Sequence, residues 1–278
     1  RGRGIAITPP NKEVRKTRSV AATLRYDFGG AVLTAISGYR AYDVDSFQDL
    51  SYNPFVTAFG GGRSTSVETG KQFSQEIRLN GEAGAITWLA GGFFQSDSVD
   101  YDYLFNIPAF GPESLSASRY KRRELAGFGE ATWNVAGGFD LTAGLRVARE
   151  RHHNRNNAPS DQTRHFTLVT PKFRAAYRFD DSKLVYASAT RGARSGGFDR
   201  LTGNPGYDSE YLWSYEAGFK SEWIDRTLAI NLAIFRIDWT DQQIKSMPMP
   251  GMILTTNAGK SRSQGVEFDM SWRPAPGF

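Results

Sequence analysis

The sequence predicts an all-β protein, an antiparallel transmembrane β-barrel of which it holds an incomplete portion of about eleven strands. Long segments alternate between apolar and polar residues with a period of two, as strands do when their two faces meet different surroundings. These segments reach about ten residues, which exceeds most soluble strands and matches a tilted membrane crossing. Their connections alternate between short turns at one end and long polar loops at the other, an asymmetry typical of membrane barrels.

Composition limits what this chain can form. The 278 residues include 29 glycines, 13% aromatic residues and no cysteine, so neither a disulfide framework nor thiolate metal binding is available. Mean hydropathy is −0.46, and no run approaches the ~18 apolar residues that a membrane-spanning helix needs. The net charge of +5 fits arginines in a solvated barrel interior. We therefore expect no nucleic-acid partner.

The clearest hairpin covers residues 211–239. In its first arm the aromatic residues share one parity and the charged residues the other. The aromatic parity holds Trp213, Tyr215, Phe219 and Trp223, and the polar parity holds Ser214, Glu216, Lys220 and Glu222. Because the aromatic rings gather near the ends of the arms, where amphipathic rings prefer a membrane–water interface, we interpret this segment as a membrane hairpin.

The second arm, residues 227–239, alternates less cleanly. Its isoleucines and leucines share a parity with Arg236 and Asp238. Either a β-bulge or a plugged barrel interior would account for charges on that parity, and the sequence does not choose between them.

The other strands follow the same hairpin pattern. In chain order they are expected over residues 19–28, 31–43, 72–80, 85–97, 124–135, 139–150, 167–179, 183–191 and 261–272. Short turns are expected at 29–30, 81–84, 137–138 and 180–182, and long loops at 44–70, 98–121, 151–165, 192–210 and 240–257. Single-chain bacterial barrels use even strand numbers. The odd count predicts that residues 1–278 form one partial barrel domain.

The segment 167–179 gives the most specific prediction of faces. Lipid-facing positions are expected at Phe173, Ala175 and Tyr177, and lumen-facing positions at Lys172, Arg174 and Arg178. The difference in connection length also predicts sidedness, with the short turns in the periplasm and the long loops outside the cell.

Motifs for catalysis or metal binding are scarce. His152 and His153, with His165, form the one histidine cluster, and we expect solvated loop histidines rather than metal ligands because neighbouring residues of a strand point in opposite directions. No serine, histidine and acid form a recognisable nucleophile arrangement. The glycine-rich segment 191–197 lacks the Lys-Ser/Thr ending of a phosphate-binding loop. We therefore expect a protein that is not an enzyme and holds no metal and no cofactor.

Several motifs in series resemble the TonB-dependent outer-membrane receptors. They are Gln72-Phe-Ser-Gln-Glu-Ile-Arg-Leu79, Trp88-Leu-Ala-Gly-Gly-Phe-Phe94, Val185-Tyr-Ala-Ser-Ala-Thr-Arg-Gly192, Ser195-Gly-Gly-Phe198, Ser214 to Trp223, Phe235 to Gln242, Asn257-Ala-Gly-Lys260 and Gly265-Val-Glu-Phe268. Their order and spacing are similar to the middle and later barrel of that family, over roughly residues 20–275.

The resemblance implies a receptor in the outer membrane of a Gram-negative bacterium. Such a receptor has a barrel of about 22 strands around an N-terminal plug. It imports a scarce ligand, most often a ferric siderophore, with energy passed from the inner membrane by the TonB complex. Relative to the family pattern, the plug, the TonB-contacting segment and the closing strands are absent from these residues. The implied partners are outer-membrane lipid, the TonB complex and an iron chelate.

Ligand contacts are expected from long loops and the lumen, where cations attract an anionic chelate. The candidates are Tyr101, Tyr103, His152, His153, Arg155, Arg191, Arg194 and Tyr207. The aromatic residues of segment 98–121 could instead form an interface belt or pack within their own loop. Three other functions stay open: a passive channel, the barrel of an outer-membrane enzyme, and a soluble all-β binding module.

Overall fold

The computed structural model describes residues 11–51, 54–135, 137–157, 161–199, 206–249 and 252–274. Eleven antiparallel strands form one sheet in the order β1-β2-β3-β4-β5-β6-β7-β8-β9-β10-β13. A separate two-stranded sheet pairs β11 with β12. The expected all-β class and the expected eleven strands are confirmed.

Most strands are longer than the ranges predicted from the sequence. Their bounds are β1 Lys12–Asp27, β2 Ala31–Asp49, β3 Arg63–Ala83, β4 Ile86–Asn106, β5 Ser114–Asn134, β6 Phe139–Asn156, β7 Asp161–Asp180, β8 Lys183–Arg194, β9 Glu210–Trp223, β10 Leu228–Thr240, β11 Gln243–Met249, β12 Met252–Asn257 and β13 Lys260–Trp272. Two short helices lie in connections, α1 at Pro54–Ala58 and η1 at Pro108–Phe110.

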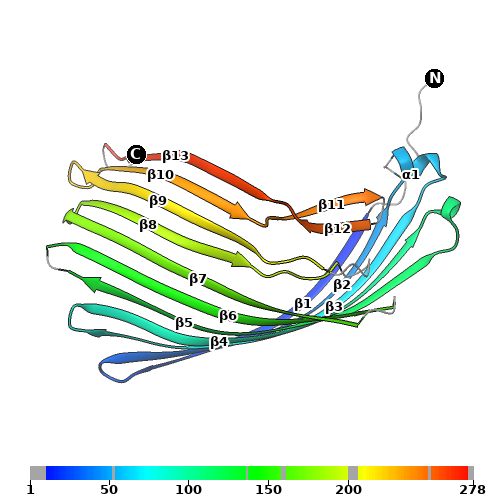
Figure 1. Cartoon of the computed structure of the whole chain (residues 1–278), viewed down its shortest axis with the longest axis horizontal. Helices are drawn as coiled ribbons and strands as arrows, with labels where there is room; N and C mark the ends of the chain where they lie inside the picture. The colour runs from blue at the N-terminus through cyan, green and yellow to red at the C-terminus, as the bar shows by residue number, and fades with distance from the viewer. Residues whose placement is uncertain are drawn as a thin grey trace.

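The sheet curves into an open trough with two different ends. Figure 1 shows the tight turns at the left-hand end and α1 with the β11–β12 hairpin at the other end. The loops predicted at 44–70, 98–121 and 151–165 are wrong in extent, because β2 to β7 continue through much of them. Apart from β4, where Tyr101, Tyr103 and Phe105 share one parity, both faces of these extensions are mostly polar. The alternation that marks a strand is therefore weak there although the backbone ladder continues.

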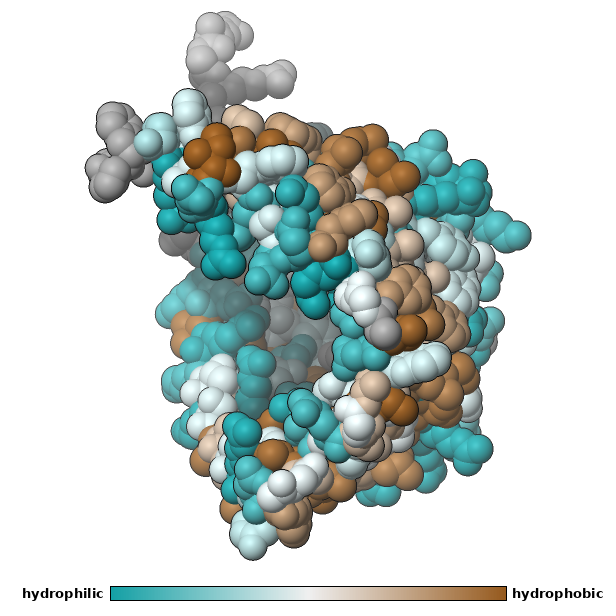
Figure 2. Space-filling view, turned by 90° about the vertical axis from the view of Figure 1, so that its left-hand side faces the viewer, coloured by the Kyte–Doolittle hydropathy of each residue, from teal (hydrophilic) through white to brown (hydrophobic). Residues whose placement is uncertain are grey.

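The two faces of the trough differ in chemistry. Seen from the short-turn end, hydrophilic residues line a hollow and hydrophobic residues gather on the outer surface (Figure 2). On the outer face of β7, Phe173 is 52% exposed. On the lumen face of β7, Lys172 pairs with Glu130 of β5 at 2.8 Å, and the Arg174 guanidinium lies over the Tyr186 ring. The predicted separation of these side chains onto two faces is confirmed.

The register of β10 explains its irregular pattern. It pairs with β9 and β13 without a shift from Leu228 to Thr240, so there is no bulge in this strand. Ile234 and Arg236 lie on the same outer face, and there Arg236 binds Asp238 at 2.8 Å. The charges thus mark where the outer face passes from an apolar band to polar surroundings, which is neither of the two explanations that the sequence left open.

Backbone features fix the ends of several strands. The turn between β9 and β10 has positive φ at Ile224, Asp225 and Arg226. A Cβ on Gly138, where φ is 82°, would lie 2.4 Å from the Arg178 carbonyl oxygen, so this turn requires glycine. The β7–β8 ladder stops at Lys172, next to Pro171, which has no N–H to donate. Among the described residues, no helix is long and apolar enough to span a membrane.

Candidate functional site

A network of charged side chains covers the lumen face of β4, β5 and β6 toward the end with the longer connections. Arg122 of β5 is its centre: Nε lies 2.8 Å from Asp97 Oδ2 of β4, and Nη1 lies 3.7 Å from Glu150 Oε2 of β6. Arg146 of β6 binds Glu124 of β5 at 2.6 Å. The network therefore joins three neighbouring strands through their side chains as well as through their backbone ladders.

His152 is part of this network and is buried, with 2% of its surface exposed. Its Nδ1 lies 2.7 Å from the Tyr120 hydroxyl, and its Nε2 lies 2.6 Å from Glu150 Oε2. The Phe166 ring meets the imidazole edge to face at 5.0 Å. The expectation that His152 is a solvated loop residue is therefore wrong. It fails because β6 extends to Asn156, and alternation turns His152 into the lumen.

The Glu150 carboxylate stays ionised although it is buried. Glu150 lies beyond the apolar band, since its neighbours Arg149 and Arg151 are exposed on the outer face. Burial alone would raise the pKa of this carboxyl group, but the hydrogen bond with His152 and the positive charge of Arg122 outweigh it, and the pKa is lowered. A buried carboxylate between these two groups holds the network together.

The connection after β8 folds over this surface. Gly197 and Tyr207 exchange backbone hydrogen bonds of 3.0 Å, and Arg164 of β7 donates to the Tyr207 carbonyl oxygen at 2.8 Å. A Cβ on Gly196 would lie 2.6 Å from the Phe166 ring, so only glycine lets the backbone approach so closely. The described part of this connection thus covers Phe166, and Phe198 within it is buried.

An aromatic ladder runs along the lumen face of β4 beyond the charged network. Tyr101 stacks on Tyr103 with ring centroids 6.2 Å apart, and Tyr103 stacks on Phe105 at 6.3 Å. Burial raises the pKa of the Tyr103 hydroxyl, partly offset by a hydrogen bond with Ser64. These residues are half-buried strand residues rather than loop residues. The ladder presents flat apolar faces bordered by hydroxyl groups.

The other predicted ligand residues are divided between the two faces. Arg194 lies exposed at the end of β8, 3.8 Å from Glu210. His153 and Arg155 take the outer parity of β6, and His153 Nδ1 lies 3.1 Å from the Thr163 hydroxyl. Arg191 shares the outer parity of β8, and its guanidinium lies 4.1 Å from the centre of the Tyr211 ring. The structure therefore brings Tyr101, Tyr103 and His152 to the lumen face but not His153, Arg155 or Arg191.

Sequence reasoning missed Arg122, Glu150 and Arg146, the residues that hold the network together. Arg146 and Glu150 lie in the predicted strand 139–150, where alternation places them on the polar parity, whereas Arg122 precedes the predicted strand 124–135. Their pairing across strands needed the register, which no local pattern gives.

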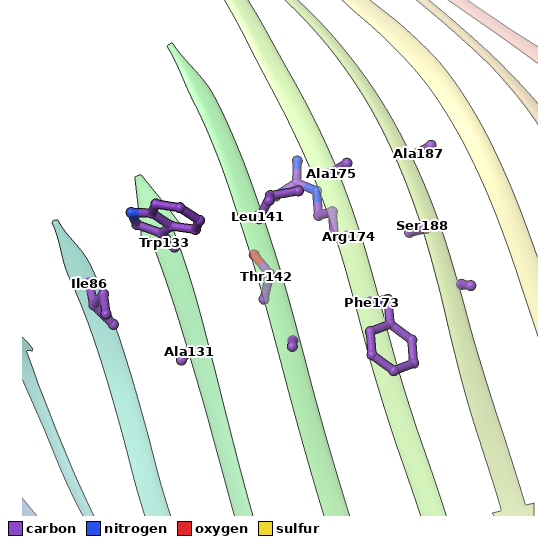
Figure 3. Close-up of a pocket in the computed structure, with 12 residues that line it drawn as sticks. Ile86, Ala131, Trp133, Leu141, Thr142, Phe173, Arg174, Ala175, Ala187 and Ser188 are labelled. Carbon is purple, nitrogen blue, oxygen red and sulfur yellow. The ribbon is translucent and has the colours of Figure 1, made fainter. Parts of the chain in front are cut away.

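An apolar groove lies on the opposite side of the sheet. It has a volume of about 660 Å³ and crosses β4 to β8, where Trp133, Leu141 and Phe173 surround a run of alanines. In Figure 3, Trp133 and Ala131 lie along one strand, and Phe173 and Ala175 lie along another. Because the groove lies within the outer apolar band, it is a recess in the predicted lipid-facing surface and belongs to no lumen site.

Comparison with known proteins identifies the architecture. The sequence profile of the family described as "TonB dependent receptor-like, beta-barrel" matches residues 2–278. The pesticin receptor of Yersinia enterocolitica is 28% identical over 219 residues, which cover 73% of this chain and 32% of that protein. The ferripyoverdine receptor of Pseudomonas aeruginosa is 27% identical over 189 residues, covering 66% of this chain and 23% of that protein.

Solved structures show the same fold. The ferric yersiniabactin uptake receptor FyuA from Yersinia pestis matches with a TM-score of 0.80 and 20% identity, covering 98% of this chain and 42% of that one. The siderophore receptor PiuA from Acinetobacter baumannii matches with a TM-score of 0.77 and 13% identity, covering 95% of this chain and 45% of that one. The chain thus spans about a third of the length of the pesticin receptor and less than half of these structures. The chain belongs to the TonB-dependent receptor family and matches its β-barrel.

Proposed function

We propose that this chain contributes strands to the wall of an outer-membrane receptor that imports a ferric siderophore with energy supplied through TonB. The observation that carries the proposal is the lumen face of β4 to β7, where the aromatic ladder lies beside the charged network. Iron chelates combine flat unsaturated groups with charge. Stacked rings and nearby cations complement both features.

The comparisons support this class of ligand. Relatives and similar structures bear the names of receptors for pesticin, ferripyoverdine and ferric yersiniabactin. The exposed apolar residues of the outer face support placement in a membrane, since a soluble sheet does not expose a continuous apolar band. The ligand contacts in this proposal are Tyr101, Tyr103, Arg194 and Tyr207.

The test is binding and uptake by the full receptor that contains this chain. Cells that lack or express the receptor are given ⁵⁵Fe-loaded phenolate, catecholate and hydroxamate siderophores under iron limitation. At least one should accumulate only with the receptor and only while TonB and the proton-motive force are intact. Uptake that persists without TonB would support a passive channel, and recovery of the protein without detergent would support a soluble module.

A matched pair of variants tests the aromatic ladder. Tyr103→Ala removes a ring from the lumen face, whereas Leu104→Ala alters the neighbouring residue on the outer face. We expect Tyr103→Ala to weaken siderophore binding roughly tenfold, given the usual value of one aromatic contact. Leu104→Ala should leave binding unchanged. Equal siderophore affinity in both variants would show that the aromatic ladder does not contact the ligand.

A further inference from the structure

Four cations gather on the outer face of β5 and β6, just beyond the apolar band. Lys121 and Arg123 lie on β5, Arg149 and Arg151 lie on β6, and all four are exposed. We call these four residues the outer basic cluster. Leu125, which is 65% exposed, occupies the next outward position of β5, so the cluster begins where the apolar surface ends.

The register of the sheet places these like charges side by side. Arg123 is directly opposite Arg151, and Arg149 is opposite Leu125, one outward position along the strand. Directly opposed residues have Cα atoms about 5 Å apart, and like charges in such pairs destabilise a sheet. This arrangement therefore costs folding free energy unless an anion lies nearby.

The flanking strands supply no such anion. The outward residues opposite Arg123 and Lys121 on β4 are Ser96 and Ser98. The outward residues opposite Arg149 and Arg151 on β7 are Thr167 and His165. Both flanks of the cluster are thus uncharged or basic at this level.

The carboxylates nearest to the outer basic cluster bind other residues. Asp97, Glu124 and Glu150 point to the lumen, where they bind Arg122 and Arg146. On the outer face, Asp100 binds Arg119, and Asp161 lies 3.4 Å from His153. Within the described part of the chain, no carboxylate lies within ion-pair distance of the four cations.

Two cations on the outer face of β10 and β13 are neutralised. Arg236 of β10 and Arg262 of β13 share Asp238 at 2.8 and 2.5 Å. Arg236 lies one outward-facing position beyond Ile234, and Arg262 lies two beyond Val266. The lack of carboxylates therefore distinguishes β5 and β6 from β10 and β13.

We propose that the outer basic cluster binds the phosphate groups of a bisphosphorylated glycolipid in the outer leaflet. The side chains project sideways from the barrel wall at the edge of the apolar band, which is the level of lipid headgroups. Arginine binds phosphate oxygens bidentately, and four cations match two phosphates better than the single phosphate of a common phospholipid. The adjoining apolar face accommodates the acyl chains. This inference rests on the proposed membrane placement and not on the identity of the siderophore.

The test uses the full receptor, purified in a neutral detergent and stripped of lipid. Binding of diphosphoryl lipid A is measured by native mass spectrometry and by thermal stabilisation, with dephosphorylated lipid A and phosphatidylglycerol as probes. The variant Arg123→Gln/Arg151→Gln removes two cluster charges, and Arg236→Gln/Arg262→Gln removes two paired charges as a control. We expect affinity for diphosphoryl lipid A to fall roughly fivefold for each cluster charge removed. The control should bind as wild type does.

Folding and function are read separately. Resistance to SDS before boiling reports the folded barrel, and Arg123→Lys/Arg151→Lys should retain most of the lipid affinity because it keeps both charges. Ferric siderophore binding should be unchanged in the cluster variant. If the wild-type receptor bound no ferric siderophore, that result would contradict the proposed function and leave the lipid proposal intact. Equal lipid affinity in the cluster variant and wild type would overturn the proposal. So would equal binding of dephosphorylated lipid A or of phosphatidylglycerol.

Discussion

Arg122 and Arg123 are neighbours in β5, yet only Arg122 has carboxylate counter-ions among the described residues. On the lumen face, Arg122 lies within 4.0 Å of Asp97, Glu124 and Glu150. On the outer face, Arg123 lies opposite Arg151. One face of the sheet supplies every counter-ion for its arginine, and the other supplies none from the protein.

This difference separates charges that are paired within the protein from charges that have no counter-ion within it. A charge enclosed with its counter-ions contributes to stability mainly because removing one partner leaves the others unpaired and desolvated. An exposed charge among like charges lowers the free energy of unfolding, so the fold itself gives no reason for its presence. Composition alone counts both as arginine, and only the parity of the strand tells them apart.

The largest expected effect comes from breaking the lumen network. Glu150→Ala leaves Arg122 and the buried His152 without their shared carboxylate. Because Arg122 keeps Asp97, we expect a loss of about 2–3 kcal/mol in the free energy of unfolding, below the usual cost of an orphaned buried charge. Urea unfolding of the full receptor in phospholipid vesicles measures it.

The matched control is Asp100→Asn, which removes the acid bound to Arg119 on the outer face. That pair is exposed to solvent, so its loss should not change stability detectably. Similar values for the two variants would show that the network has no special role.

The second prediction compares the faces within the apolar band. Ala131 lies on the outer face of β5, and Thr132 lies beside it on the lumen face opposite Thr142. Ala131→Arg should lower the free energy of unfolding by about 2 kcal/mol, since a charge is placed in lipid. Thr132→Arg should cost far less, because Glu130 and Asp140 lie nearby on the same face. Equal losses would contradict the assignment of faces.

The fold could be predicted because alternation is a local property. The pattern in 167–179 assigned Phe173 and Lys172 to opposite faces without any knowledge of the neighbouring strands. Strand ends could not be predicted where both faces are polar, as in β6 beyond Glu150, since hydrogen bonding between backbones needs no alternation.

The site was harder to predict because it depends on register. Tyr101 and Tyr103 were chosen as ligand candidates from their residue types, and the structure places both on the lumen face of β4. Arg155 and Arg191 were chosen as arginines near loops, yet parity directs both to the outer face. Arg122 and Glu150 meet only because β5 and β6 pair with one particular offset, and a shift of one residue would put them on the other face.

A smaller effect is expected from relieving the repulsion in the outer basic cluster. In neutral detergent without anionic lipid, Arg123→Gln should raise the free energy of unfolding by about 0.5 kcal/mol, the usual cost of like charges directly opposite each other. Arg236→Gln, which breaks a pair with Asp238 at the same level, should give no gain. The gain should disappear when diphosphoryl lipid A is present. A loss of stability without lipid would mean that Arg123 has a counter-ion within the protein.

The smallest effect concerns the short turn after β7, where a single carboxylate organises the backbone. Asp180 accepts hydrogen bonds from the Ser182 hydroxyl at 2.6 Å and from the Ser182 amide at 2.8 Å, and from Lys183 at 3.3 Å. The Ser182 hydroxyl is the main cause, followed by its amide, and together with Lys183 they lower the pKa of this exposed carboxyl group from 3.8 to about 2. Because the folded pKa lies below the unfolded one, the turn is stabilised in full above about pH 4, and this stabilisation is lost as the pH falls toward 2. Asp180→Asn should remove that part of the pH dependence, measured as thermal stability between pH 5 and 2. Asp181→Asn removes the neighbouring charge but keeps these hydrogen bonds, so it should retain the wild-type profile. An identical profile for Asp180→Asn and wild type would show that the carboxylate does not stabilise the turn.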